Sequence, residues 1–223
     1  MTSAREEILR KLTTSVYPVP EPPDFEQPVF PPVIFSPELT FRTQLEAISG
    51  KVFIFQSETE LFNSLKKQLE QFQPGTVYCS EPEIKTNLQR FEIAFKEYGS
   101  DAKNIEAGIT GCEFLVAQTG SVMVSSVQGG GRQMNIFPPL HIVIASKDQL
   151  VATLEEAYSN IQQKYIDDLP SQIALVTGPS RTADIEKTLV LGAHGPRELW
   201  VFYFIALNKL SLFSFILFFT FAH

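Results

Sequence analysis

The fold class is decided by the stretch "LHIVIASKDQLVATLEEAYSNIQQKYIDDLPSQIALVTG", which runs from Leu140 to Gly178. It begins with the short apolar run LHIVIAS and ends with a second one, QIALVTG. Both runs are typical of buried strands, and the polar–apolar segment between them is typical of a helix. A strand, a helix and a strand in this order predict an α/β fold with a mainly parallel sheet and helices on both faces.

The same alternation continues through the rest of the chain. Apolar spacing and Gly or Pro breaks separate the segments, and Ser57 with Glu60 forms a capping-box pattern at one helix start. No internal repeat accompanies the alternation. The predicted helices are 37–50, 57–72, 81–99, 147–165 and 181–192, and the predicted strands are 51–55, 76–80, two pieces within 105–126, 140–146, 172–178 and 197–202.

A chain of 223 residues suits one domain with an arm. Residues 1–35 are predicted to hold a short amphipathic helix followed by a proline-rich arm, because proline lacks the N–H that helices and inner strands need. The arm either lies as a strap over its own domain or grips a partner subunit. Residues 36–202 then form the α/β domain, and residues 203–223 form an apolar tail.

The segment from Leu199 to His223 is apolar almost throughout and long enough to span a bilayer of about 30 Å. Lys209 lies in its middle, where a charge costs roughly 2.5–3.5 kcal/mol on insertion scales. Three explanations stay open: read-through of a shifted frame, a membrane anchor, or a packed extension. The N-terminus has acidic residues and no apolar signal-peptide region, so we expect a cytoplasmic protein.

Composition excludes some classes of function. A net charge of −7 argues against a general nucleic-acid binder, which needs Lys and Arg to neutralise phosphates. Cys79 and Cys112 belong to no cysteine cluster, whereas an iron–sulfur cluster or structural zinc usually needs about four ligands. We therefore expect no metal and no cofactor in this chain, and two small buried thiols.

The segment "TGPSRTADIE" (177–186) follows the predicted strand 172–178 and is a candidate ligand loop. In α/β sheets, ligands bind beyond the carboxyl ends of the strands. Gly178 permits a close backbone approach, and Ser180 or Thr182 can cap the following helix. Arg181 could then supply a two-pronged contact to a carboxylate or phosphate at the helix start.

A plainer interpretation of this loop remains open. In it, the loop is only a well-capped helix start, and Arg181 pairs with Asp184 or Glu186. No Ser-His-Asp order, HExxH motif or paired-carboxylate spacing stands out elsewhere, so the catalytic residues are unknown from the pattern.

Two further loops resemble the first in composition. Thr119, Gly120 and Ser121 lie between two apolar runs, as a tight turn or a ligand-facing loop. Gly129–Gly131 precede Arg132 and suit a hairpin tip or a phosphate-approaching loop, although neither GxxxxGK[ST] nor GxGxxG is present.

Two histidines are candidates for different roles. His194 lies between Gly192 and Gly195, where it could donate a proton, contact a ligand or only shape a turn. His141 begins a buried strand and is expected to be a core histidine.

Three blocks in order carry a resemblance to a known family: "GITGCEFLVAQTGSVMVSS" (108–126), "GRQMNIFPPLHIVIA" (131–145) and "ALVTGPSRTADIEKTLVLGAHGPRELWV" (174–201). Together they resemble the lactate-utilisation protein C family, the LUD-domain proteins, over about residues 105–202. The resemblance implies a parallel-rich sheet flanked by helices, as in the sugar-phosphate isomerase and CoA-transferase superfamily.

The same resemblance implies a role in oxidising L-lactate to pyruvate beside two partner proteins that carry the iron–sulfur clusters. It does not assign catalytic residues. Including the neighbouring Ser121, the ligand-binding candidates are Thr119, Gly120, Ser121, Arg132, Gly178, Ser180, Arg181, Thr182, Asp184 and His194; Glu186 and Gly195 also match the family's motifs.

The chain departs from the family at Gln118, where members often have Glu before the Thr-Gly pair. An amide cannot act as a base or nucleophile, and Glu113 is the nearest carboxylate that could replace it. The main hypothesis is a subunit or accessory protein of an iron–sulfur lactate-oxidising system that binds a small carboxylate or a partner through these loops. The alternatives are a free-standing enzyme acting on a phosphorylated or CoA-linked acid, and a pure scaffold.

Overall fold

The computed structural model describes residues 3–14, 21–22, 35–99, 102, 104–128, 133–182 and 190–205. The chain divides into two units, Met1–Pro31 and Pro32–His223, and each is described by itself. The predicted proline-rich arm, apart from residues 21–22 and 35, and the tail from residue 206 onward lie outside the described residues. Within the described ranges, no helix is both long enough and apolar enough to cross a membrane.

The first unit contains helix α1 (Ala4–Thr14), which confirms the short helix predicted there. Its start is capped reciprocally. The Glu6 N–H donates to Ser3 Oγ at 3.3 Å, and the Ser3 N–H donates to Glu6 Oε2 at 2.8 Å.

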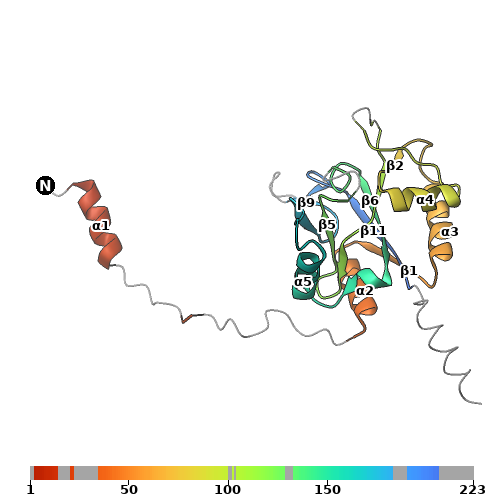
Figure 1. Cartoon of the computed structure of the whole chain (residues 1–223). Coiled ribbons are helices and arrows are strands. Elements are labelled where there is room, and N and C mark those ends of the chain that lie inside the picture. Colours follow the sequence, from red (N-terminus) through yellow and green to blue (C-terminus); the bar gives the residue numbers. More distant parts are fainter. Residues whose placement is uncertain are drawn as a thin grey trace, which may run out of the picture. The chain divides into compact units, whose positions relative to one another are not determined.

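The second unit is built on a five-stranded sheet with all neighbouring strands parallel, here called the parallel sheet (Figure 1). Its central strands are long apolar runs, as expected when both faces of a strand are buried. The predicted parallel-rich α/β fold is confirmed. The strand order is β1 (Lys51–Phe55), β11 (Glu198–Phe204), β6 (Leu140–Ser146), β3 (Ala107–Thr110) and β2 (Val77–Cys79).

Alternate side chains of each strand enter two different cores. On one face, Ile142 and Phe202 pack with apolar residues of α3 (Glu58–Leu69) and α4 (Pro82–Arg90). On the other face, Val143 and Val201 pack with residues of α2 (Pro37–Ala47) and of a second sheet. Figure 1 shows α3 and α4 on one side of the parallel sheet, and β5 with α5 on the other.

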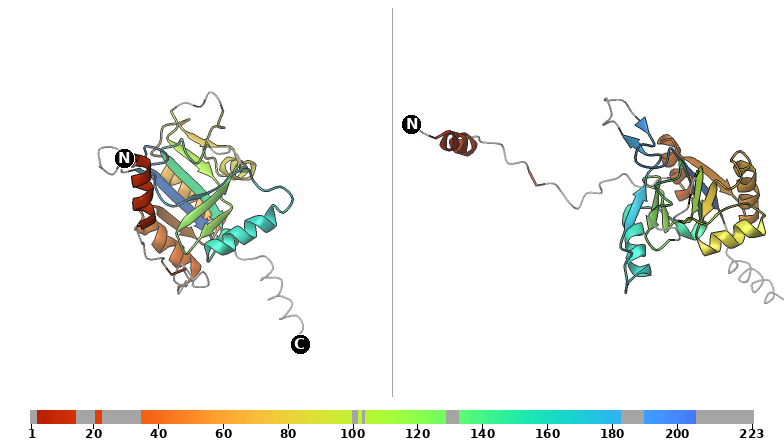
Figure 2. Two further views of the ribbon diagram at one scale, coloured as in Figure 1. Left: turned by 90° about the vertical axis from the view of Figure 1, so that its left-hand side faces the viewer. Right: turned by 90° about the horizontal axis from the view of Figure 1, so that it is seen from above.

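The second sheet, here called the mixed sheet, has the order β7 (Leu150–Val151), β4 (Phe114–Val116), β5 (Ser121–Ser125) and β8 (Ile173–Val176). Strand β4 is parallel to β7 and antiparallel to β5, which is antiparallel to β8. Helix α5 (Leu154–Lys164) packs on its outer face, as the view from above in Figure 2 also shows. The unit therefore has four layers. Helices α3 and α4 form the first, the parallel sheet the second, the mixed sheet together with α2 the third, and α5 the fourth.

The predicted strand 172–178 therefore exists as β8, but it lies in the mixed sheet and not beside β6 in the parallel sheet. The segment 105–126 forms three strands, β3, β4 and β5, where two were predicted. A pattern of apolar residues identifies strands, but it does not say which sheet each strand joins.

Two helix predictions overrun. Helix α4 ends at Arg90 rather than near residue 99, because Glu92 has a φ of 55° and breaks the helix. The predicted helix 147–165 is a 3₁₀ turn, η1 (Lys147–Gln149), then β7, and then α5, whose first turn is capped by Thr153. In both places the chain leaves helical geometry to pair with a neighbouring strand: Lys96 bridges to Tyr78, and β7 pairs with β4.

The prediction that His141 is a core residue is confirmed. Its ring is fully buried between the sheets, and Nε2 lies 2.7 Å from the Thr110 hydroxyl oxygen. Burial lowers the pKa of His141 from 6.5 to about 4. The folded protein therefore holds this ring neutral under conditions in which an unfolded chain would protonate it.

This gives a pH-dependent stability. Above pH 6.5 both states hold a neutral ring; as the pH falls toward 4, only the unfolded state gains the proton, and the folded state loses up to about 3 kcal/mol of stability. Urea unfolding at pH 7.5 and pH 4.5 should show a smaller acid loss for His141→Gln than for the unmutated chain. The exposed His194, changed to Gln, is the matched control and should keep the full loss; equal losses in all three proteins would contradict the assignment.

Candidate functional site

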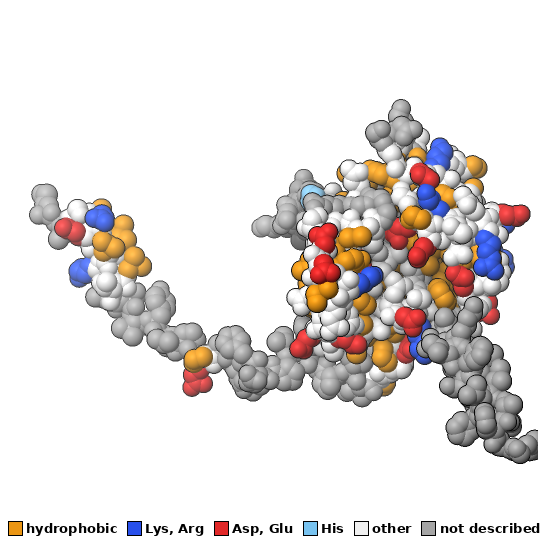
Figure 3. Space-filling view, in the orientation of Figure 1, with side chains coloured by type: hydrophobic (Ala, Val, Ile, Leu, Met, Phe, Trp, Pro, Cys, Tyr) orange, Lys and Arg blue, Asp and Glu red, His pale blue; other side chains and the backbone are white. Residues whose placement is uncertain are grey.

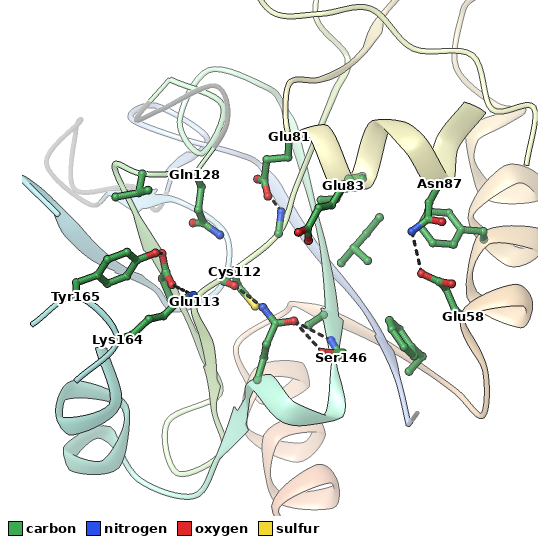
Figure 4. Close-up of a pocket in the computed structure, with 18 residues that line it drawn as sticks. Glu58, Glu81, Glu83, Asn87, Cys112, Glu113, Gln128, Ser146, Lys164 and Tyr165 are labelled. Atoms are coloured by element: carbon green, nitrogen blue, oxygen red, sulfur yellow. Dashed lines mark hydrogen bonds and ion pairs between the residues drawn. The ribbon is translucent and has the colours of Figure 1, made fainter. Parts of the chain in front are cut away.

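A cavity of about 330 Å³ opens at the carboxyl ends of strands β2, β3, β6 and β11 (Figure 4). Residues that follow β2 and β3 form its centre, and α3, α4 and α5 contribute its sides. This is the edge of a parallel sheet at which α/β proteins bind their ligands. We take this cavity as the candidate functional site.

The centre of the cavity is the connection Gly111–Glu113, which joins β3 of the parallel sheet to β4 of the mixed sheet. A connection of three residues is too short to form a loop. Its last residue, Glu113, is therefore already hydrogen-bonded to the mixed sheet, because its N–H donates to the Met123 carbonyl at 2.8 Å. The Glu113 side chain borders the cavity, although the residue is only 3% exposed. Burial of a carboxylate requires compensating partners.

Glu113 has three such partners, and two of them, Lys164 and Tyr165, are drawn with it in Figure 4. Its Oε1 accepts hydrogen bonds from the Ser125 hydroxyl at 2.5 Å and the Tyr165 hydroxyl at 3.0 Å. Its Oε2 forms an ion pair with Lys164 Nζ at 2.8 Å. Burial alone would lower the pKa of Lys164, but the hydrogen bond and charge of Glu113 outweigh it and raise that pKa. These four side chains are called the Glu113 network below.

Glu81 follows β2 and approaches the same connection. Its Oε1 accepts a hydrogen bond from the Gly111 N–H at 2.8 Å, and a Cβ at residue 111 would lie 2.8 Å from Glu81 Oε2. A side chain at residue 111 would therefore displace the Glu81 carboxyl group from this position. Burial, reinforced by the nearby charges of Glu113 and Glu83, raises the pKa of Glu81 to about 7, although the Gly111 hydrogen bond opposes the shift.

The two cysteines are free thiols, and neither is suited to act as a nucleophile or a metal ligand. Cys79 and Cys112 are both buried, as predicted. Burial raises the pKa of Cys79 to about 12 and that of Cys112 further above its ordinary value, so neither is a thiolate near neutral pH. Among the described residues, no group of three or more His, Cys, Asp or Glu side chains is placed to hold a metal ion.

The cavity carries more acidic than basic groups. Acidic side chains also lie across the middle of this face in the space-filling view (Figure 3). The arrangement suits hydrogen bonding and proton transfer, and it opposes phosphate and other multiply charged anions. The charged residues that line the cavity are Glu58, Glu81, Glu83, Glu113 and Lys164.

Several of the residues predicted for the site lie in a separate cluster outside the cavity. Thr119 Oγ1 lies 2.7 Å from Ser121 Oγ, which lies 2.8 Å from Thr177 Oγ1, so the two predicted loops do meet. Gly120, with a φ of 63°, packs against the backbone of α2, where a Cβ would lie 2.5 Å from the Leu45 nitrogen. None of these residues lines the cavity.

The second of these loops is tied to the residues after α2. Arg181 Nη2 donates to the Ile48 carbonyl at 2.6 Å and to Ser49 Oγ at 2.9 Å. Gly178 also packs on Ile48. Arg181 and Thr182 form strand β9 (Arg181–Thr182), which pairs antiparallel with β10 (Val190–Leu191).

The predicted helix 181–192 is therefore wrong at both described ends, which are strands. Arg132, Asp184 and Glu186 lie outside the described residues. His194 is exposed on the turn after β10, and Gly195 packs near the Ser180 side chain.

Sequence reasoning named Glu113 only as a substitute carboxylate, and missed Glu81, Lys164 and Tyr165. Glu81 had a usable signal, since it follows a predicted strand directly and precedes Pro82. Lys164 and Tyr165 lie 51 and 52 residues from Glu113 in the chain, and no local pattern links them.

Comparisons with known proteins agree with this architecture. The sequence model of the LUD domain family matches residues 39–202. The chain is 27% identical over 201 residues to Lactate utilization protein C of Oceanobacillus iheyensis, which covers 72% of this chain and 84% of that protein. It is 40% identical over 124 residues to Lactate utilization protein C of Shouchella clausii, covering 55% of this chain but only 49% of that protein.

A solved structure shares the fold. The crystal structure of a DUF162 family protein from Deinococcus radiodurans matches with a TM-score of 0.57 and 18% sequence identity. The match covers 76% of this chain and 96% of that chain, so the two chains share their fold.

We expect the packing of the Thr119–Ser121 turn against α2 to stabilise the fold. Gly120→Ala should lower the free energy of unfolding by about 2 kcal/mol or more, because the new Cβ meets α2 and the backbone is left-handed. Gly195→Ala is the control: its Cβ would lie 3.2 Å from Ser180 Cβ, and a loss of about 1 kcal/mol or less is expected. Similar urea midpoints for the two variants would argue against this packing.

The Glu113 network should be energetically coupled. Glu113→Gln should cost about 1–3 kcal/mol of unfolding free energy, because Lys164 loses its buried partner charge. A double-mutant cycle with Lys164→Met should give a coupling of about 1 kcal/mol. Glu155→Gln, on the exposed side of α5, is the matched control and should change little. Purely additive single effects would refute the coupling.

Proposed function

The chain belongs to the LUD domain family, and on this premise we propose that it works in a lactate-utilisation system. Support comes from two relatives from different organisms that are both named Lactate utilization protein C. In this proposal, the cavity at the carboxyl ends of the parallel strands is the working site of the chain. The observation that carries this assignment is the buried Glu113 network at the centre of the cavity.

The finer proposal is that the system oxidises L-lactate to pyruvate and that separate partner proteins carry its iron–sulfur clusters. The chain has two cysteines, fewer than the four ligands a cluster usually needs. Both are buried and of raised pKa, which further disfavours ligation by thiolates. This chain would then contribute binding or proton handling, and the electrons would pass to its partners.

In this proposal the loop around Arg181 is a contact surface and not part of the cavity. Arg181 is exposed and, although held by Ile48 and Ser49, presents positive charge at the surface. We propose that it meets an acidic surface of a partner or a small carboxylate. A free-standing enzyme for phosphorylated or CoA-linked acids finds less support, because the acidic lining of the cavity repels such anions.

The test is lactate-dependent dye reduction by candidate iron–sulfur partner proteins, with and without this chain. Omitting the chain should reduce the rate to background. Glu113→Gln should lower the rate by about tenfold or more if the network belongs to the working site. Glu155→Gln, exposed on α5, should keep the full rate.

A rate that does not change when the chain is omitted would overturn the proposed function. A rate that needs the chain but is unaffected by Glu113→Gln would support the role in lactate utilisation. It would contradict the assignment of the cavity as the functional site. In that second case, a loss with Arg181→Ala would move the working site to the loop cluster beside α2.

A further inference from the structure

Glu81 differs from the other cavity carboxylates in how it is held. The Gly111 N–H fixes its Oε1, and the missing Cβ of Gly111 leaves Oε2 lying over the backbone at the edge of the cavity. Oε2 accepts no hydrogen bond from any of the described residues. One oxygen is therefore held in place while the other is available to a ligand.

The opposite side of the cavity behaves differently. Glu113 has both oxygens occupied by Ser125, Tyr165 and Lys164, so its charge is already compensated. Figure 4 shows Glu113, Lys164 and Tyr165 on one side of Cys112 and Glu81 on the other. Two carboxyl groups in one cavity thus differ in their partners: both oxygens of Glu113 are occupied, whereas Glu81 keeps one oxygen for a ligand.

The charges that surround Glu81 limit what can bind beside it. Glu83 on α4 and Glu58 on α3 are negative, and Lys164 on α5 is committed to Glu113. An added anion would meet repulsion without a free cation among the described lining residues. An uncharged molecule with hydroxyl or carbonyl oxygens avoids that cost and can hydrogen-bond to the carboxyl groups.

We propose that the cavity binds a small uncharged compound bearing hydroxyl or carbonyl groups, and that Glu81 exchanges a proton with one of its oxygens. In the acid form, the O–H bond of Glu81 breaks and a new O–H bond forms on a carbonyl oxygen, which takes up the positive charge of the proton while Glu81 becomes a carboxylate. In the carboxylate form, Glu81 accepts the proton of a hydroxyl group. No electrons are transferred in either direction. The inference rests on the proposed function only for the assignment of this cavity as the working site.

The experiment uses the full chain without partners and two probes with the same carbon skeleton, lactamide and L-lactate. Affinities are measured at pH 6 and pH 8.5 by NMR titration, together with the carbon-13 titration of the glutamate carboxyl groups. Lactamide should bind at both pH values. Lactate should bind about tenfold or more weakly at pH 8.5 than at pH 6, because Glu81 gains its charge between them.

Two variants separate the role of Glu81 from general electrostatics. Glu81→Gln should abolish the pH dependence of lactate binding and remove the glutamate signal that titrates near neutral pH. Gly111→Ala keeps the carboxyl group but displaces it, and should weaken lactamide binding by about tenfold. Glu155→Gln should behave like the unmutated chain.

Equal affinities for the two probes at pH 8.5, or a pH dependence that survives Glu81→Gln, would overturn the inference. So would the absence of lactamide binding at about 100 mM, since a ligand of this size should still be detected there. These outcomes concern the isolated chain. The dye-reduction assay can therefore contradict the proposed function while the binding experiment supports this inference. The binding experiment can likewise contradict the inference while the assay supports the proposed function.

Discussion

The structure depends on one short connection, Gly111–Glu113, through which the chain passes from the parallel sheet to the mixed sheet. Because only three residues are available, the carboxylate of Glu113 is carried into the interior, where an unpaired charge could not persist. Lys164 and Tyr165 at the end of α5 supply its partners, so α5 must lie against the mixed sheet. The same connection brings the Gly111 N–H to the Glu81 carboxyl group, and both residues line the cavity.

Much of the fold is readable from local sequence patterns. The cap of α3 at Ser57 and the apolar runs of β6 and β11 follow from capping and burial, which are short-range effects. The errors arise where pairing with a distant strand outweighs helix propensity. Phe91, Ile93 and Phe95 recur every second residue, a spacing typical of extended chain, and this signal could have ended α4 correctly. The assignment of β8 to a second sheet has no comparable local signal.

The candidate site was less predictable than the fold. Glycine-rich loops with Arg181 have the composition of a ligand site, and the structure does bring Thr119–Ser121 and Thr177–Arg181 together. That composition also suits close packing on α2, where Gly120 has no space for a Cβ. The cavity instead joins residues of α3, α4, α5 and four strand ends, and only the topology of the sheets places them side by side.

Hydrogen–deuterium exchange of the full chain tests the central claim, that the acidic cavity is the working surface, most directly. The chain is compared alone and with iron–sulfur partner proteins during turnover of L-lactate. The account predicts slower exchange in peptides containing Gly111–Glu113 and the end of α5, because their backbone borders the cavity. Protection confined to the Thr119–Ser121 and Thr177–Thr182 loops, with the cavity peptides unchanged, would contradict it.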